Sequence, residues 1–143
     1  MLFFGMQFQT VDPKGRIVLP ARFKRLLIPS DQDTLVLNLG REECLLLFPL
    51  SEWALLVSAL DALPKNEDKR DTIRSISDST LYLDLDASGR LTIPRDCLDR
   101  VGIEREVAIV GHSRYIELFS RTSYEKDRER RRQASSAILD QLL

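Results

Sequence analysis

Two pairs of oppositely charged residues with identical spacing are the best candidates for chemistry in this chain of 143 residues. Asp12 precedes Arg16 by four positions, and Asp86 precedes Arg90 by four positions. An arginine guanidinium can donate two parallel hydrogen bonds to O6 and N7 of guanine in the major groove of DNA. An exposed Asp–Arg pair can also be a plain ion pair, which contributes about 0–1 kcal/mol. The two pairs therefore indicate either DNA recognition or a structural role in a turn.

The residues that would support catalysis or metal binding are isolated in the sequence. His112 is the only histidine, and Cys44 and Cys97 are far apart, with no further ligand at metal-binding spacing. One histidine is not enough for a convincing Ser-His-Asp or Cys-His arrangement, and the sequence has no glycine-rich phosphate-binding loop. We therefore expect a protein that is not an enzyme and that needs no metal and no cofactor.

The composition is that of a folded, soluble protein. Hydrophobic residues make up 43% of the chain and charged residues 30%, and the net charge is −1, so neither disorder nor a generally basic coat protein is indicated. The longest purely apolar run, from Leu45 to Leu50, is far shorter than the roughly 20 residues that cross a membrane. The apolar start of the chain lacks the basic region and cleavage site of a signal peptide. We expect a cytoplasmic protein without membrane contact.

The chain contains an internal repeat. Residues 12–20 read DPKGRIVLP and residues 86–94 read DASGRLTIP, at an offset of 74 positions. A second pair of blocks follows in the same order, LLLF at 45–48 and IELF at 116–119. Agreement of two blocks in one order indicates duplication of a small unit. Because so small a unit barely sustains a core of its own, we expect the two copies to interlock as one pseudo-two-fold body.

Each repeat begins with a well-specified turn, at residues 12–15 and 86–89. Aspartate at the first position can accept backbone hydrogen bonds, and glycine is favoured at the fourth. Aliphatic residues alternate with others in the segment after each turn, so Arg16 and Arg90 should face away from the buried side. Extended segments flank both turns and predict a hairpin in each copy; they span residues 7–11, 16–19, 81–85 and 90–93.

The remaining elements follow the same order in both copies. A short helix is expected after Pro20 and after Pro94, and two more strands then precede a closing helix. Ser51 is the expected N-cap of a helix over residues 52–63, and Thr122 that of the helical tail. Residues 65–78 are strongly charged and are interpreted as a short helix or linker. The helix over 52–63 carries an apolar stripe made of Leu55, Leu56, Ala59, Leu60 and Leu63.

The motif Asp-x-x-Gly-Arg-aliphatic-x-aliphatic-Pro, present twice, together with the block LLLFPLSEW, resembles the MraZ family. That family is a tandem form of the AbrB/SpoVT swapped-hairpin DNA-binding domain. The resemblance covers nearly the whole chain and implies a β-rich α+β fold, in which two tandem swapped-hairpin units form one pseudo-two-fold body with helices after each unit. The implied segments are a first unit over 5–51, connecting helices over 52–78, a second unit over 79–122 and a C-terminal helix over 123–143.

The resemblance also implies a function. Members of the family are bacterial transcriptional regulators of the division and cell-wall gene cluster, including their own promoter. They form ring-shaped homo-oligomers on repeated short sites in double-stranded DNA, which implies a cytoplasmic, nucleoid-associated location. The family's Asp-x-x-x-Arg motif contacts DNA, and it corresponds here to Asp12 with Arg16 and to Asp86 with Arg90. The second copy departs from the first in having Ser88 where the first has Lys14.

The distribution of charge indicates which residues would bind DNA. Residues 1–30 contain five basic side chains and one acid, whereas residues 84–100 contain three basic and four acidic ones. The first copy is therefore expected to face the phosphates, with Arg16 as the base-reading candidate. The predicted DNA-binding residues are Lys14, Arg16, Arg22, Lys24, Arg25 and Arg90, and the residues that shape and orient the turns are Asp12, Gly15, Asp86 and Gly89.

Two further interpretations concern other partners. The same hairpin fold can serve as a protein-interaction module that holds a partner, as an antitoxin holds a toxin. The duplication and the helical pattern of the tail speak against that alternative. The basic run at 128–132 is mixed with acids, so it is interpreted as a solvated helix face rather than as a second DNA contact.

Overall fold

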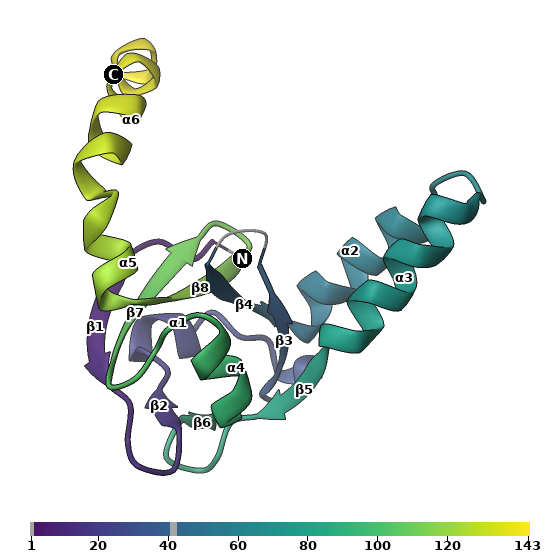
Figure 1. Cartoon of the computed structure of the whole chain (residues 1–143), viewed down its shortest axis with the longest axis horizontal. Helices are drawn as coiled ribbons and strands as arrows, with labels where there is room; N and C mark the ends of the chain where they lie inside the picture. The colour runs from purple at the N-terminus through teal and green to yellow at the C-terminus, as the bar shows by residue number, and fades with distance from the viewer. Residues whose placement is uncertain (1, 41–42) are drawn as a thin grey trace.

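The computed structural model describes residues 2–40 and 43–143 and shows one central body with two helical arms (Figure 1). The first copy forms β1 (Met6–Thr10), β2 (Arg16–Val18), α1 (Ala21–Lys24), the 3-10 turn η1 (Pro29–Asp31), β3 (Thr34–Leu39) and β4 (Cys44–Pro49). Helices α2 (Leu50–Asp61) and α3 (Glu67–Ser79) lead to the second copy. The second copy forms β5 (Leu81–Asp84), β6 (Arg90–Thr92), α4 (Arg95–Arg100), β7 (Glu106–His112) and β8 (Tyr115–Ser120), followed by α5 (Arg121–Lys126) and α6 (Arg128–Leu142).

The two copies share one antiparallel sheet. Its six strands run in the order β1-β7-β8-β4-β3-β5, and β2 and β6 form a separate two-stranded ribbon. The equivalent strands of the two copies are β1 and β5, β3 and β7, and β4 and β8. When each strand is replaced by its equivalent, the same strand order is obtained, read from the opposite edge of the sheet. The sheet therefore has a pseudo-two-fold axis between β4 and β8. The predicted α+β fold with two interlocked tandem copies is confirmed.

The strands beside each turn do not pair with each other, and the local hairpin prediction is wrong on this point. The turns themselves are present, because the Gly15 N–H donates to the Asp12 carbonyl at 2.9 Å and the Gly89 N–H to the Asp86 carbonyl at 3.0 Å. Beyond the turns, however, β1 pairs with β7 and β2 pairs with β6. Neither copy can bury its own aliphatic residues alone, so each of the four strands beside the turns pairs with a strand of the other copy.

The core lies between the ribbon and the large sheet. Ile17 and Leu19 from β2 and its end, and Leu91 and Ile93 from the equivalent segment, are fully buried, as their alternation predicts. Burial of one such side chain stabilises the fold by about 1.5–3 kcal/mol. They pack with residues of both copies, including Leu35, Leu45, Leu98, Ile109 and Leu118, in one continuous cluster. The shared core makes the two copies a single folding unit.

Helices α2 and α3 form an arm that projects from the sheet edge carrying β3 and β5 (Figure 1). Ser51 does not cap α2, because the helix begins at Leu50 after Pro49 and the Ser51 hydroxyl donates to Asp31 at 2.8 Å. The charged segment after the first arm helix is a helix, capped by the Asn66 side chain. Only Trp53 of α2 is buried, so the expected apolar stripe does not cover the core within this chain.

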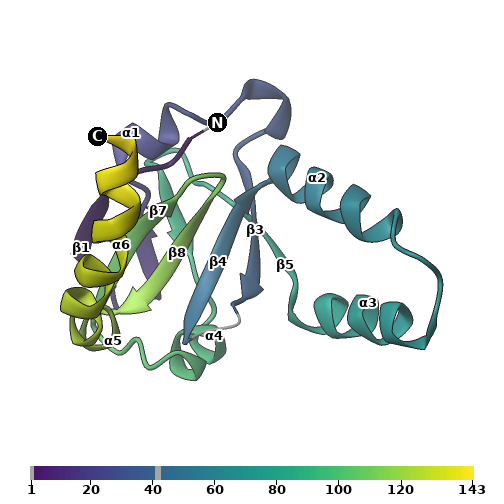
Figure 2. The same ribbon diagram turned by 90° about the horizontal axis from the view of Figure 1, so that it is seen from above.

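The second arm consists of α5 and α6 at the opposite end of the sheet (Figure 2). Thr122 is not the N-cap of the tail, because the Ser120 side chain accepts the hydrogen bond from the Ser123 N–H at 3.1 Å. The predicted single tail helix is interrupted at Asp127, where α5 ends and α6 begins. Among the described residues, no helix has the length and apolar character needed to span a membrane.

Candidate nucleic-acid interface

The β2–β6 ribbon brings the two Asp–Arg motifs together. Arg16 lies opposite Thr92 and Arg90 lies opposite Val18, so both arginines occupy the outward side of a ribbon whose inward side is buried. The turn glycines extend the ribbon at its two ends, because the Ile93 N–H donates to the Gly15 carbonyl and the Leu19 N–H to the Gly89 carbonyl. The sequence predicted that each arginine faces away from the core, but it did not predict that they share one surface.

Each aspartate both shapes its turn and holds its arginine. In the first copy, one carboxylate oxygen of Asp12 accepts the backbone N–H groups of Lys14 and Arg16 at 2.9 and 2.8 Å. The other oxygen accepts from Arg16 Nε at 2.6 Å. The structural and the orienting interpretations of this pair therefore both apply.

The second copy repeats the arrangement more loosely. Asp86 accepts the backbone N–H groups of Ser88 and Arg90 at 2.8 and 2.9 Å, and Arg90 Nε at 3.2 Å. Both ion pairs are partly solvated, that of Arg90 more than that of Arg16. Among the described contacts, each bond uses one of the five N–H donors of its guanidinium, which leaves four for an outside acceptor.

The backbone of each turn keeps its aspartate ionised. The Arg16 N–H holds the pKa of the Asp12 carboxyl below its usual range, and burial opposes that effect only in part. The Arg90 N–H lowers the pKa of Asp86 in the same way. Hydrogen bonds to the charged form favour it, so both carboxylates remain acceptors for their arginines at neutral pH.

A glutamine braces the first turn and has no counterpart in the second. Gln9 Nε2 donates to the Val18 carbonyl at 2.6 Å, and the Val18 N–H donates to Gln9 Oε1 at 3.0 Å. The side-chain amide thus takes the place of a backbone partner between β1 and β2. The equivalent position of the second copy, 74 residues later, holds Leu83, which cannot make these bonds. Gln9 was not among the residues predicted from the sequence, although the break in the repeat at this position was a visible signal.

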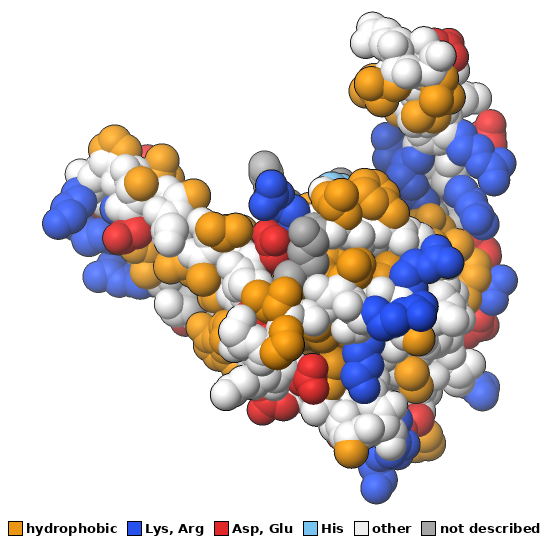
Figure 3. Space-filling model, turned by 180° about the vertical axis from the view of Figure 1, so that it is seen from behind, with side chains coloured by type: hydrophobic (Ala, Val, Ile, Leu, Met, Phe, Trp, Pro, Cys, Tyr) orange, Lys and Arg blue, Asp and Glu red, His pale blue; other side chains and the backbone are white. Residues whose placement is uncertain are grey.

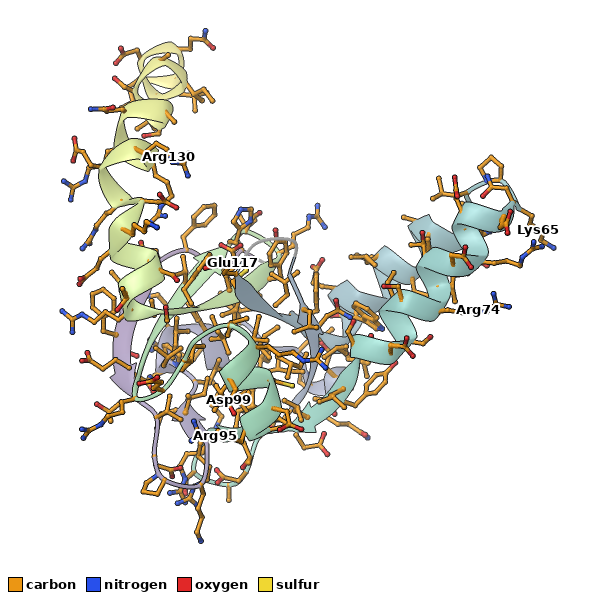
Figure 4. All side chains as sticks on the ribbon, in the orientation of Figure 1. Lys65, Arg74, Arg95, Asp99, Glu117 and Arg130 are labelled. Carbon is orange, nitrogen blue, oxygen red and sulfur yellow. The ribbon has the colours of Figure 1, made fainter. Side chains whose placement is uncertain are left out.

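Basic side chains near each turn come from the other copy. The Nζ atom of Lys24 lies 3.5 Å from the position that a Cβ atom on Gly89 would occupy, so this first-copy lysine stands beside the second turn. Arg95, Glu104 and Arg105 of the second copy line a hollow of about 470 Å³ together with Asp12 and Pro13 of the first turn. Figure 4 shows Arg95 at the start of α4, close to the turns.

This exchange changes the electrostatic prediction. Counting charges along the sequence made the first copy the basic one, but interlocking places Lys24 beside the second turn, and Arg95 and Arg105, with Glu104, beside the first. Arg95 and Arg105 were not predicted as site residues, and only the pairing of the copies could have found them. The first turn therefore has Lys14, Arg16, Arg95 and Arg105 near it, and the second has Arg90 and Lys24.

The other predicted basic residues lie on one flank of the body. Arg22 and Arg25 line a hollow of about 440 Å³ beside Phe4 and the start of β1. Figure 3 shows basic side chains gathered over the region of α1 and at the turns below it. These positions suit contact with a charged backbone rather than with base edges.

The histidine, the aligned tyrosine and the basic run of the tail make packing contacts within the protein. His112 stacks on Tyr115 with ring centroids 4.8 Å apart, and Tyr124 packs edge-on against Phe8. In the tail, Arg131 Nη2 donates to the Tyr124 carbonyl at 2.5 Å, and its guanidinium lies over the Tyr124 ring. Within residues 2–40 and 43–143 no three His, Cys, Asp or Glu side chains are grouped as metal ligands would be.

Comparison with known proteins gives a consistent result. A family profile described as "MraZ protein, putative antitoxin-like" matches residues 2–75 and again residues 79–142. A protein of Marinomonas sp. named "Transcriptional regulator MraZ" is 33% identical over 130 residues, which cover 90% of this chain and 86% of that protein.

Two further relatives carry the same name. The protein of Moorella thermoacetica is 31% identical over 126 residues, 87% of this chain and 85% of its own length. That of Christiangramia forsetii is 32% identical over 121 residues, 83% of this chain and 78% of its own length. The duplicated turns, the interlocked sheet and these matches agree, and the chain belongs to the MraZ family.

Proposed function

We propose that this protein is a sequence-specific DNA-binding regulator of transcription that acts as a ring-shaped homo-oligomer on repeated short promoter sites. Its proposed targets are the division and cell-wall gene cluster and its own promoter, and its proposed location is the cytoplasm, in association with the nucleoid. The observation that carries the proposal is the β2–β6 ribbon with Arg16 and Arg90 on one outward side. The name of the relatives, transcriptional regulator, supports the same role.

The ribbon has the right form for reading bases. The major groove is about 12 Å wide and admits a two-stranded ribbon as well as a helix. Arg16 and Arg90 would enter it with their guanidinium groups already held by Asp12 and Asp86. A side chain held in its bound conformation loses less freedom on binding, so the aspartates would strengthen recognition without touching DNA.

The surrounding cations would bind the phosphates. Lys14, Lys24, Arg95 and Arg105 stand near the turns, where the sugar–phosphate walls of the groove would lie. Each neutralised phosphate steepens the salt dependence of log K by about 0.9. Such contacts fix the position of the ribbon, while the two arginines distinguish sequences.

Repetition would supply the affinity. One short ribbon makes few contacts, but copies held in one assembly meet neighbouring sites at high effective concentration, which raises the overall affinity by orders of magnitude. Regularly spaced short repeats upstream of the regulated gene are therefore the expected target.

The test compares Arg16→Ala with the unmodified protein on DNA from upstream of its own gene and on a scrambled fragment. Arg16→Ala is expected to abolish the preference for the specific fragment while leaving the size of the assembly unchanged. A mobility shift measures binding, and light scattering measures size. The matched control is Arg74→Ala, because Arg74 is an exposed arginine paired with Asp71 on α3, far from the ribbon. Full specific binding by folded Arg16→Ala protein would contradict the proposal.

A protein-interaction module is the second candidate, and the words "putative antitoxin-like" in the family description favour it. In that case a small partner would co-purify with this chain in a fixed ratio, and the specific DNA would not be retained by the purified protein. Purification from native cells followed by mass measurement of the complex separates the two functions.

A further inference from the structure

The α2–α3 arm carries an apolar groove that nothing in the described chain fills. Residues of both helices and of β5 line it, around a space of about 460 Å³; they include Trp53, Val57 and Leu60 of α2, Ile73 and Ile76 of α3, and Tyr82 of β5. Val57 is 42% exposed and Ile73 is 41% exposed, although both belong to the inner side of a helix pair. An exposed apolar surface of this kind marks a site of interaction.

The arm is built rigidly for an element that stands away from the core. Lys69 is buried, and its ammonium group donates to the carbonyls of Asp61 and Leu63 at 2.8 Å each, which satisfies the C-terminal end of α2. The Asn66 side chain accepts the Lys69 N–H and so fixes the start of α3. Capping of both ends at the same bend holds the two helices in a fixed relation, and the groove between them is preformed.

The C-terminal arm presents the complementary shape, a single helix with an uncovered apolar stripe. The structure describes all fifteen residues of α6, and none of them is buried. Ala134, Ile138 and Leu142 follow each other at intervals of four along its last turns, and Leu139 lies beside them. Ile138 is 61% exposed. This i, i+4, i+8 pattern is the one with which an amphipathic helix enters an apolar groove.

The charges of the two arms are also complementary. Residues 50–79 contain six acidic and four basic side chains, whereas residues 121–143 contain six basic and four acidic ones. Asp61 lines the groove itself, and the arginines of α6 stand on the turns just before its apolar stripe. Opposite charge on the two surfaces favours this pairing over the pairing of two like arms.

The groove cannot be filled by the helix of the same chain. Both views place the α2–α3 arm and the α5–α6 arm at opposite ends of the sheet, with the strands between them (Figures 1 and 2). We propose that the apolar end of α6 of one copy docks in the α2–α3 groove of a second copy of this chain. Each bound pair leaves one free groove and one free helix, so the contact is head-to-tail and propagates until a ring closes. The inference rests on the homo-oligomer of the proposed function and names its contact.

The test mixes two variants, one with a disrupted α2–α3 groove and one with a disrupted apolar stripe on α6, and measures whether the mixture assembles. The groove variant carries Val57→Arg and Ile73→Arg, and the helix variant carries Ile138→Arg and Leu142→Arg; all four positions are exposed, so the fold should survive. Each variant alone is expected to run as a monomer of 16.4 kDa in light scattering. An equimolar mixture is expected to form a dimer of twice that mass and nothing larger, because only one intact groove and one intact helix remain.

Matched controls place arginine on the other sides of the same helices. Leu55→Arg lies away from the groove on α2, and Ser136→Arg lies away from the apolar stripe on α6, and both are expected to keep the wild-type size. Circular dichroism establishes that every variant is folded. A mixture that stays monomeric, or a control that breaks the assembly as fully as its partner variant, would overturn the docking of α6 in the groove.

The outcome also separates this inference from the proposed function. A monomeric wild-type protein would remove the ring itself and the docking with it. A wild-type oligomer that persists in both double variants would overturn only the docking, and specific DNA binding and its loss in Arg16→Ala would stand.

Discussion

The first and second turns have the same backbone and different supports. Both place an arginine on the outward side of the ribbon and bind it to an aspartate, at 2.6 Å in the first copy and 3.2 Å in the second. Only the first is braced by Gln9, and only the first has a lysine in the turn, where the second has Ser88. The second instead has Lys24, which comes from the other copy.

The difference shows what duplication within one chain permits. A dimer of identical units would have two equal turns, but here each turn can change independently while the ribbon keeps them together. In the proposed function, the braced first turn would make a firm contact with DNA and the looser second turn an adaptable one. An unequal pair would also give the protein a direction along the proposed DNA target, which suits direct repeats better than palindromes.

The largest difference between the turns is expected in their glycines. A Cβ atom on Gly15 would lie 2.6 Å from the Ile93 carbonyl oxygen, which is backbone and cannot move aside, whereas one on Gly89 would meet the flexible end of Lys24 at 3.5 Å. Both residues have positive φ, which already disfavours alanine. We expect Gly15→Ala to destabilise by about 4 kcal/mol and Gly89→Ala by about 1–2 kcal/mol. Urea denaturation measures both, and equal losses would contradict the difference.

Removal of the second arginine should weaken DNA binding less than removal of the first. Arg90 is more exposed and its ion pair is longer, so less of its orientation is fixed before binding. We expect Arg90→Ala to cost about 1–2 kcal/mol of specific binding and to retain a preference for the specific site. Fluorescence anisotropy on specific and scrambled DNA measures this. If Arg90→Ala lost all specificity and Arg16→Ala kept it, the ranking of the turns would be reversed.

Restoring the missing lysine should make the turns more alike. Ser88→Lys places a cation where the first copy has Lys14. One additional phosphate contact should steepen the slope of log K against log salt by about 0.9 for each second turn bound. The preference between DNA sequences should stay the same, because phosphate contacts carry no base information. Salt titration of the variant and of the wild type gives the slopes, and unchanged slopes would place the second turn away from DNA.

The smallest expected difference is in acid titration. The backbone N–H of Arg16 lowers the pKa of Asp12, and that of Arg90 lowers the pKa of Asp86. A carboxyl whose folded pKa lies below its unfolded pKa contributes stability that is fully present above the unfolded value and is lost as pH falls through the folded value. Carbon-13 NMR should show both carboxyls titrating below an ordinary aspartate, and Asn substitution of either should flatten the acid limb of stability. An ordinary aspartate pKa at both positions would show that the two carboxylates do not accept the turn hydrogen bonds in solution.

The sequence predicted the structure best where the internal repeat and the alternation of aliphatic with other residues pointed to the same elements. The buried pairs Ile17 with Leu19 and Leu91 with Ile93, and the turns before them, follow from local patterns. Strand partners do not, because a local pattern identifies a strand but not which of two equivalent strands it joins. The exposure of the predicted stripe on α2 could not be foreseen either, because the spacing of apolar residues along a helix does not say whether they become buried, and only Trp53 of this helix is. The unit boundaries at 5–51 and 79–122 and the DNA-binding residues stay predictions.

The pairing of β1 with β7 has a consequence for synthesis of the protein. Phe8 lies opposite Ala108, so a hundred residues separate these partners. A ribosome adds about 5–20 residues per second, so the first strand waits about 5–20 s for its partner to be made. During that time β2 also lacks β6, and the emerging polypeptide has Arg16 but no β2–β6 ribbon. A chain that terminates before β6 therefore lacks the ribbon altogether, and the proposed DNA surface exists only once translation has passed both turns.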